Sequence, residues 1–352
     1  MPGIIPARVR PRTKVPGSAS RSWRLASLRG GLLGLGCLWC SACGPELDAV
    51  AISKRTVSCD TGLDISAPEP LMAAEAMGLC QRADGANPGL VSASYVRADG
   101  SQRVQADGYG ILSDFGPNVA PREGSALLAL SSGAARTPGE PNYVGRYGDQ
   151  TGDTVAAPPG FPRLPPACDG HFTVTPVQAT ANDSAGLELL LHTPSNAQAL
   201  SFDFAFYTTD YPSNVCAVSD DTFAVFVDPE PIGALLGNVV FDSQILPISV
   251  NNPLIRVCHP PLSAADQALV RLGPPYFECP LGAAALQANG YEAGAATGWL
   301  TTRVPVAPDS DVRVRFMIWD AEDFDRDSTV LIDHFSWDVN AGATLPTTVP
   351  AQ

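Results

Sequence analysis

The sequence predicts an all-β fold, a jelly-roll-like β-sandwich with a few short helices and long loops. Glycine and proline contribute 32 and 33 of the 352 residues, a density of helix breakers that helical folds tolerate badly. Apolar residues make up 45% of the chain, which is enough for a buried core. Several short segments alternate apolar and polar side chains, as half-buried strands do.

The first part of the chain contains one helical segment followed by short strands. Residues 71–80 (LMAAEAMGLC) have helical spacing and no proline, so we expect a short helix there. Strand-like pieces between turn residues follow at 90–96, 109–113 and 126–130. Residues 138–166 are loop-like throughout, and they are either a linker between two domains or a long excursion within one.

The second part of the chain has the clearer strand pattern. Residues 201–207 (SFDFAFY) place three phenylalanines on one face, and residues 312–319 (VRVRFMIW) alternate in the same way. A capping box at Ser263 predicts a short helix over residues 264–272. Further strands are expected at residues 187–191, 222–227, 239–241 and 329–339.

The amino terminus has the features of an export signal. Residues 1–43 contain seven basic residues and no acidic one, with a short apolar run near their end. The sequence Cys40-Ser41-Ala42-Cys43 resembles the bacterial lipobox. We therefore expect residues 1–43 to be a lipoprotein signal peptide, Cys43 to be the lipidated residue, and residues 44–69 to be a flexible tether. An ordinary signal peptide cleaved nearby is the alternative.

These expectations place the protein in the cell envelope, as an outer-membrane lipoprotein or at the cell surface. The lipid would be its contact with the membrane. After residue 43 the chain holds 15 basic and 36 acidic residues. Because of this excess of negative charge, the domain should be repelled by nucleic acid and by anionic lipid, and divalent cations are its natural counter-ions. No Walker A sequence or dinucleotide-binding motif occurs, so no nucleotide is expected as a partner.

The cysteine content also indicates export. Six cysteines lie in the body of the chain, and no two of them form a CxxC pair. An even number in an exported chain predicts structural disulfides, whose connectivity the sequence leaves open. The six are Cys59, Cys80, Cys168, Cys216, Cys258 and Cys279.

Four segments resemble, in order, signature motifs of the choice-of-anchor L domain family. They are residues 201–212 (SFDFAFYTTDYP), 221–227 (DTFAVFV), 248–252 (ISVNN) and 314–333. Residues 130–133 (LSSG) match a further element more weakly, and Thr209-Asp210 stands where the family has Glu-Glu. The resemblance covers about residues 71–340. It implies a surface-exposed bacterial β domain with no established enzymatic activity, for which a lipid on Cys43 would be the anchor.

Residues 341–352 fall outside this resemblance, and we expect them to be a disordered tail. Within the region of resemblance, the acidic segment near the carboxy terminus is the main candidate site. Asp323, Asp325 and Asp327 alternate in a turn and supply hard oxygen ligands of the kind that Ca²⁺ prefers, with Asp320 and Asp333 on either side.

Asp333 has the strand parity of Leu331 and Phe335, so its carboxylate should point to the apolar side. A carboxylate there is costly unless it is paired or bound to metal. We therefore expect a structural Ca²⁺ site at these residues. A solvated acidic turn, or neutralisation by nearby arginines, is the alternative.

Asp210, Asp220 and Asp221 form a second acidic group. They could share the same ion or form another site if their strands lie adjacent, and they could equally belong to a simple turn. The four histidines are scattered without metal-ligand spacing, and no nucleophile motif is present.

These observations predict a non-catalytic, surface-anchored bacterial lipoprotein whose Ca²⁺-stabilised domain serves adhesion to a surface glycan or matrix protein. One alternative is a carbohydrate-binding module using exposed aromatic rings; the candidates are Tyr207, Tyr211, Trp299, Trp319 and Trp337. A second alternative is a secreted hydrolase with an acidic pair among Asp210, Asp221 and Asp323.

Overall fold

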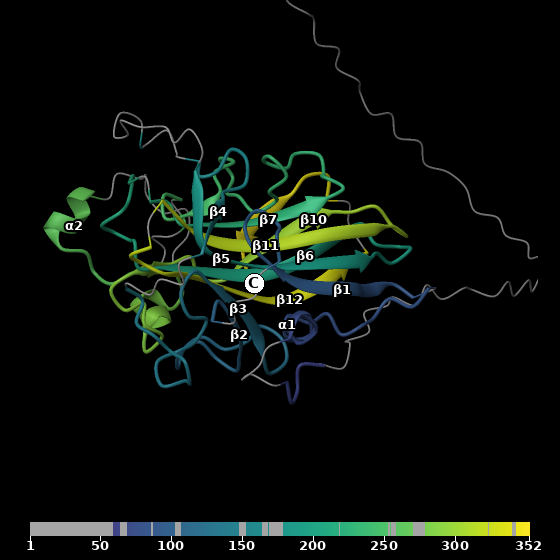
Figure 1. Ribbon diagram of the computed structural model, residues 1–352, viewed down its shortest axis with the longest axis horizontal. Helices are drawn as coiled ribbons and strands as arrows, with labels where there is room; N and C mark the ends of the chain where they lie inside the picture. The colour runs from purple at the N-terminus through teal and green to yellow at the C-terminus, as the bar shows by residue number, and fades with distance from the viewer. Residues whose placement is uncertain are drawn as a thin grey trace, which may run out of the picture. The chain divides into compact units, whose positions relative to one another are not determined.

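The computed structural model describes the β body of the chain and parts of its loops (Figure 1). The described residues are 59–63, 69–85, 87–102, 107–147, 153–163, 168, 179–217, 219–252, 254, 258–269, 279–322, 324–339 and 343–352. The predicted signal peptide, Cys43 as the predicted lipidation site, most of the predicted tether and Asp323 lie outside them. Residues 54–352 form one compact unit, so the loop at residues 138–166 lies within one domain.

Two antiparallel sheets form the body, which confirms the all-β sandwich. The first sheet has the order β1-β5-β11-β7-β8, and β4 pairs with β5. Its strands are β1 (Gly89–Val96), β4 (Thr154–Ala156), β5 (Thr180–His192), β7 (Thr222–Asp228), β8 (Ile248–Ser249) and β11 (Asp311–Ala321).

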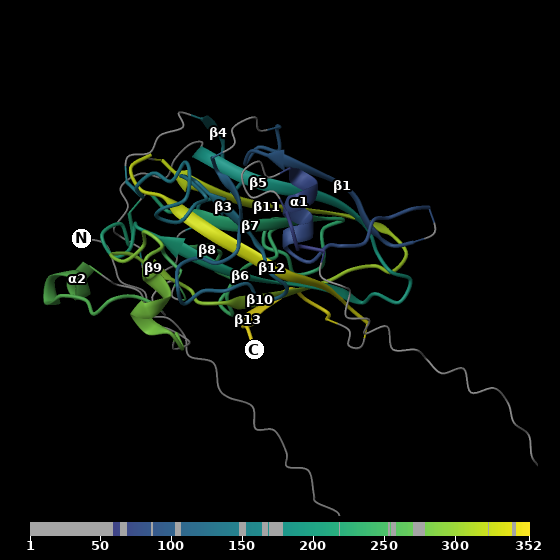
Figure 2. The ribbon, with the colours of Figure 1, turned by 90° about the horizontal axis from the view of Figure 1, so that it is seen from below.

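The second sheet has the order β13-β10-β6-β12-β3-β2, and β9 pairs with β6. Its strands are β2 (Tyr109–Leu112), β3 (Leu127–Ser131), β6 (Ala199–Thr208), β9 (Ala295–Ala296), β10 (Leu300–Pro305), β12 (Ser328–Asp338) and β13 (Thr347–Pro350). Three short helical segments accompany the sheets: α1 (Pro70–Ala76), α2 (Ala264–Leu269) and η3 (Gly282–Leu286). Figure 2 shows β6, β10 and β13 side by side.

The core lies between the two sheets and is built on the alternating face of β6. Phe202 meets Phe316 of β11 edge-to-face at 4.9 Å between ring centroids, and Phe204 meets Phe223 of β7 at 5.1 Å. These rings are fully buried, and burying each contributes roughly 2–3 kcal/mol. The opposite face of β6 is covered as well, because Tyr207 packs against Phe115 and Tyr291 outside the sandwich.

The six body cysteines form three disulfides, as the sequence predicts: Cys59–Cys80, Cys168–Cys216 and Cys258–Cys279. The first joins the amino-terminal segment to the chain just after α1.

The prediction of a disordered tail over residues 341–352 is wrong for β13. This strand pairs antiparallel with β10, and the hydroxyls of Thr302 and Thr348 lie 2.8 Å apart. Residues 239–241 form no strand, although Val239 and Val240 are buried in the core. No helix among the described residues is long and apolar enough to cross a membrane.

Candidate functional site

Four aspartates from distant parts of the sequence meet at one end of the sandwich. Asp210 follows β6, Asp221 precedes β7, Asp320 lies near the end of β11, and Asp327 precedes β12. All four side chains are fully buried. Each of Asp221 and Asp320 is acted on by the charges of other members of the group. These four residues are called the aspartate cluster below.

Strand pairing explains why the four side chains meet. β6 and β12 are antiparallel neighbours, with Thr208 opposite Ser328, so the end of one lies beside the start of the other. β7 and β11 are paired in the same way in the other sheet, with Thr222 opposite Trp319. The cluster therefore lies where these four strand ends meet.

The hydrogen bonds of the cluster satisfy only part of its oxygen atoms. The Ser328 hydroxyl donates to Asp221 Oδ2 at 2.6 Å, and Asn214 Nδ2 donates to Asp210 Oδ1 at 2.7 Å. Ser132 lies close enough to Asp320 to favour its anion, but its hydroxyl donates to the Ser328 carbonyl. Both oxygens of Asp320 are buried without a hydrogen-bond partner among the described residues.

Gly133 leaves the space that the Asp327 carboxylate occupies. A Cβ atom on Gly133 would lie 1.8 Å from Asp327 Oδ2, which no side chain could tolerate. Ser132, the preceding residue, accepts a hydrogen bond from the Ser328 backbone N–H at 3.0 Å. Residues 130–133 (LSSG), which in the sequence are only a weak match to a family element, therefore form one wall of the cluster.

The electrostatics of the cluster are unfavourable without a counter-charge. Burial raises the pKa of Asp221 and Asp320 well above the ordinary value, and repulsion from neighbouring carboxylates raises both pKa values further. Hydrogen bonding from Ser328 lowers the pKa of Asp221 by a smaller amount. Burial and mutual repulsion therefore favour a bound proton or cation at the cluster more than they do at a solvated aspartate.

The donor set fits a hard divalent cation. Ca²⁺ takes six to eight oxygen ligands from carboxylates, carbonyls, hydroxyls and water, and the cluster offers up to eight carboxylate oxygens. As the side chains are placed, no three His, Cys, Asp or Glu groups among the described residues converge closely enough to hold a metal ion. An ion at the cluster would therefore have to draw the carboxylates inward.

The two acidic groups predicted from sequence are thus redistributed. Asp320 and Asp327 from the first group join Asp210 and Asp221 from the second. Asp325 is exposed on the loop.

The prediction that Asp333 belongs to this set is wrong. Asp333 lies six residues along β12 from Asp327, roughly 20 Å at the usual rise of a strand. Its Oδ2 accepts hydrogen bonds from the backbone N–H groups of Arg122 at 2.6 Å and Glu123 at 3.2 Å. Burial raises its pKa to about 6, and the bonds from these amides and from His334 N–H oppose that shift.

The parity argument for Asp333 fails for two reasons: Leu331, which shares its parity, packs on the outer side of the sheet, and a bulge in β12 turns Phe335 inward. The register with β6 shifts between Asp333 and Ser336, and His334 has a positive φ of 54°. Phe335 therefore joins the core between the sheets, while Asp333 lies on the opposite face. On β6, the neighbouring Asp203 forms ion pairs with Arg122 at 3.0 Å and His334 at 3.3 Å.

Asp220 also stands apart from the cluster. Its Oδ1 accepts the Asn251 backbone N–H at 3.1 Å, and burial raises its pKa to about 7. The Asn251 side chain in turn accepts the Cys216 backbone N–H. Asp220 therefore braces the loop that contains the Cys168–Cys216 disulfide.

Neither alternative function gains a site at these residues. Tyr207, Tyr211 and Trp319 are buried, so they cannot form a platform for a sugar ring. Trp299 and Trp337 are half-buried against the cores. Asp210 and Asp221 have no exposed surface through which a hydrolytic substrate could reach them.

A family model described as Choice-of-anchor L domain matches residues 90–338, a span that contains the whole aspartate cluster. No curated protein matches the chain. Among solved structures, the K2 cleaved adhesin domain of Lys-gingipain is similar at 11% identity and a TM-score of 0.27, covering 73% of this chain and 95% of that one.

Proposed function

Because the chain belongs to the choice-of-anchor L domain family, we propose that it is a non-catalytic lipoprotein displayed on the bacterial cell surface for adhesion or matrix contact. It is a surface β domain with three disulfides. In this proposal a lipid on Cys43 anchors the protein and a structural Ca²⁺ ion stabilises the domain.

The observation that supports the calcium proposal is the meeting of four buried carboxylates from separate family-like segments. Repulsion among them opposes folding, and a divalent cation would convert it into attraction. Because the cluster joins the ends of β6, β7, β11 and β12, the ion would hold the two sheets together at this end.

Calcium titration of the purified, chelator-treated protein tests this proposal. We expect isothermal calorimetry to detect one saturable site, with Mg²⁺ binding more weakly because it requires a tighter octahedral shell. Asp327→Asn should abolish the binding heat. Asp325→Asn, on the exposed part of the same loop, is the matched control and should leave it unchanged. Absence of heat with the native protein would reject the ion site.

The lipid anchor is tested separately in cells that produce the full chain. Radiolabelled palmitate should be incorporated into the protein, and Cys43→Ala should prevent incorporation while Cys40→Ala does not. If neither variant changes the label, or if no label appears, the lipoprotein proposal is rejected in favour of an ordinary secreted protein. Fractionation of the same cells would assign the label to the outer membrane.

Adhesion is tested with the same strains on surfaces coated with matrix protein. Cells with the native protein should adhere more than cells with Cys43→Ala, which would release the domain into the medium. Equal adhesion of the two strains would contradict the adhesive role and leave the calcium site unaffected.

A further inference from the structure

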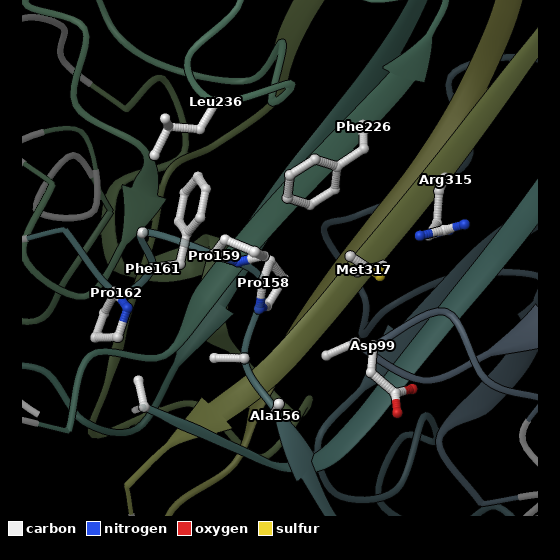
Figure 3. A pocket seen from close by; sticks show the side chains of 14 residues that line it. Asp99, Ala156, Pro158, Pro159, Phe161, Pro162, Phe226, Leu236, Arg315 and Met317 are labelled. Atoms are coloured by element: carbon white, nitrogen blue, oxygen red, sulfur yellow. The ribbon is translucent and has the colours of Figure 1, made fainter. Parts of the chain in front are cut away.

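An apolar pocket lies on the outer face of the first sheet, away from the aspartate cluster. Its volume is about 920 Å³. Figure 3 shows Arg315 and Met317 of β11 and Phe226 of β7 at the pocket, with the loop of residues 158–162 beside them. Along β11, Phe316 and Ile318 alternate with these side chains and point into the core between the sheets.

Small side chains explain why this place is hollow. Four alanines contribute to the lining and leave the space unfilled: Ala98, Ala156, Ala157 and Ala179. The wall is held in place by Phe161, whose ring packs edge-to-face against Phe226 at 5.8 Å and Trp319 at 6.2 Å. Buried aromatic packing of this kind gives a preformed rather than a collapsible pocket.

The rim of the pocket contains one acidic and one basic side chain, Asp99 and Arg315. The Arg315 guanidinium donates two hydrogen bonds to Glu188 Oε2, at 2.9 and 2.5 Å, and Arg313 lies 3.8 Å from the other oxygen of the same carboxylate. Asp99 is exposed, and Ser101 donates to it through its N–H and its hydroxyl. Slight burial opposes ionisation, but these bonds hold the pKa of Asp99 below its ordinary value. The nearby charge of Arg97 also lowers this pKa, so Asp99 is an ionised, exposed carboxylate at the rim.

We propose that this pocket binds an extended peptide segment of a partner protein, in which bulky apolar side chains are flanked by lysine or arginine. The apolar side chains would fill the hollow over Met317 and Phe226, and the basic residue would pair with Asp99. A pocket of this volume can hold a ligand the size of a drug molecule, and therefore also a few neighbouring side chains of a peptide. Leu236, which is 53% exposed at the pocket edge, extends the apolar surface.

The lining argues against other ligand classes. A sugar requires several hydrogen-bonding groups around its ring, whereas most of the lining residues here are apolar. An anionic ligand would be repelled by Asp99 and by the chain's formal charge of −14, which instead favours the approach of a basic partner. The inference is independent of the calcium site, because the aspartates lie between the sheets and the pocket lies outside them.

Fluorescence anisotropy with synthetic peptides tests this inference on the purified protein. The probe is a fluorescein-labelled peptide with a Leu-Phe-Leu core and two lysines on each side. One comparison peptide has glutamates in place of the lysines, and another has serines in place of the core. We expect saturable binding of the probe with a Kd of roughly 50 µM and at least about 10-fold weaker binding of both comparison peptides.

Three variants connect the binding to the pocket. Ala156→Trp fills the hollow from an exposed position and should weaken probe binding about 10-fold or more. Ala283→Trp adds the same ring at an exposed position outside the pocket lining and should change nothing. Asp99→Asn keeps an acceptor for Ser101 but removes the charge, and should weaken binding roughly 3-fold. Thermal unfolding of each variant confirms that it is folded.

The inference is overturned by any of three results. These are no saturable binding up to roughly 1 mM probe, equal binding of the serine-core peptide, and unchanged binding by a folded Ala156→Trp protein. The second result would mean that surface charge alone attracts the probe.

Discussion

If the aspartate cluster binds Ca²⁺ as proposed, removal of the ion should cost roughly 4 kcal/mol of folding free energy at pH 7. Without the ion, at least one of the four buried carboxyl groups must be held protonated. An aspartate in the unfolded chain has an ordinary pKa of 3.8, which lies roughly three units below pH 7. Each unit costs about 1.4 kcal/mol, so keeping the carboxyl group protonated at pH 7 costs roughly 4 kcal/mol. For a domain of this size, that loss lowers Tm by roughly 8–16 °C.

The pH dependence provides a second test of the same reasoning. Asp221 and Asp320 have raised pKa values, so their contribution to the stability of the ion-free protein is fully present below pH 3.8. It is lost as the pH rises through the raised values. At pH 5 the cost of protonation is only roughly 2 kcal/mol, so the effect of calcium on Tm should shrink to less than half.

Differential scanning calorimetry in calcium and in chelator, at pH 7 and pH 5, measures both effects. Asp320→Asn removes one charge, so in chelator at pH 7 this variant should be more stable than the native protein, although it no longer responds to calcium. Asp325→Asn is the exposed control and should behave like the native protein. An unchanged Tm in chelator at pH 7, or a calcium effect that grows toward pH 5, would refute the account.

Three further predictions concern other parts of the fold. Gly133→Ala should destabilise the protein by roughly 3 kcal/mol in urea unfolding, because its Cβ would collide with Asp327 of the cluster. Gly145→Ala, with open space around it, is the control and should be neutral. Equal effects of the two variants would contradict the role of Gly133 as a wall of the cluster. A hydrogen bond with the Asp203 carboxylate raises the pKa of His334. The ion pair between them therefore stabilises the folded protein below pH 6.5, and this stabilisation is lost as the pH rises. His334→Asn, which tolerates the positive φ, should therefore cost about 0.5–1 kcal/mol at pH 5.5 and almost nothing at pH 8.5, and a loss independent of pH would exclude the ion pair. Serines at both Cys168 and Cys216, which close a loop of 48 residues, should cost roughly 4 kcal/mol in the same assay, and a loss under about 1 kcal/mol would show that the bridge adds little.

Much of the fold could be predicted because buried strands leave a periodic pattern. The alternating phenylalanines of β6 and the alternation in β11 identify two central strands and their inward faces. The sequence does not predict β10 (Leu300–Pro305) or β13, because these short strands are rich in threonine and contain proline, with few apolar residues to give a pattern. The apolar residues 239–241 mislead for the opposite reason, since they are buried without pairing as a strand.

The candidate site was predicted only in part. Composition and spacing identify Asp320, Asp327, Asp210 and Asp221 as aspartates that need an explanation. They also suggest grouping by proximity in the chain, which is wrong for Asp333. A bulge at His334 reverses the side-chain parity of β12, and no sequence pattern marks it. The sequence does not indicate that Ser132 and Gly133 form a wall of the cluster, because this role depends on a strand nearly 200 residues away.

The sequence by itself determined the class of fold, the disulfide-forming cysteines, the family-like segments and the excess of acidic side chains. Each of these depends on residue type and on local periodicity, which are properties of short stretches of chain. Only the tertiary structure decided which carboxylates face one another, which cysteines pair and where the outer face of the sheet is hollow. These depend on which strands become antiparallel neighbours, and that pairing brings together residues whose separation along the chain exceeds any local pattern.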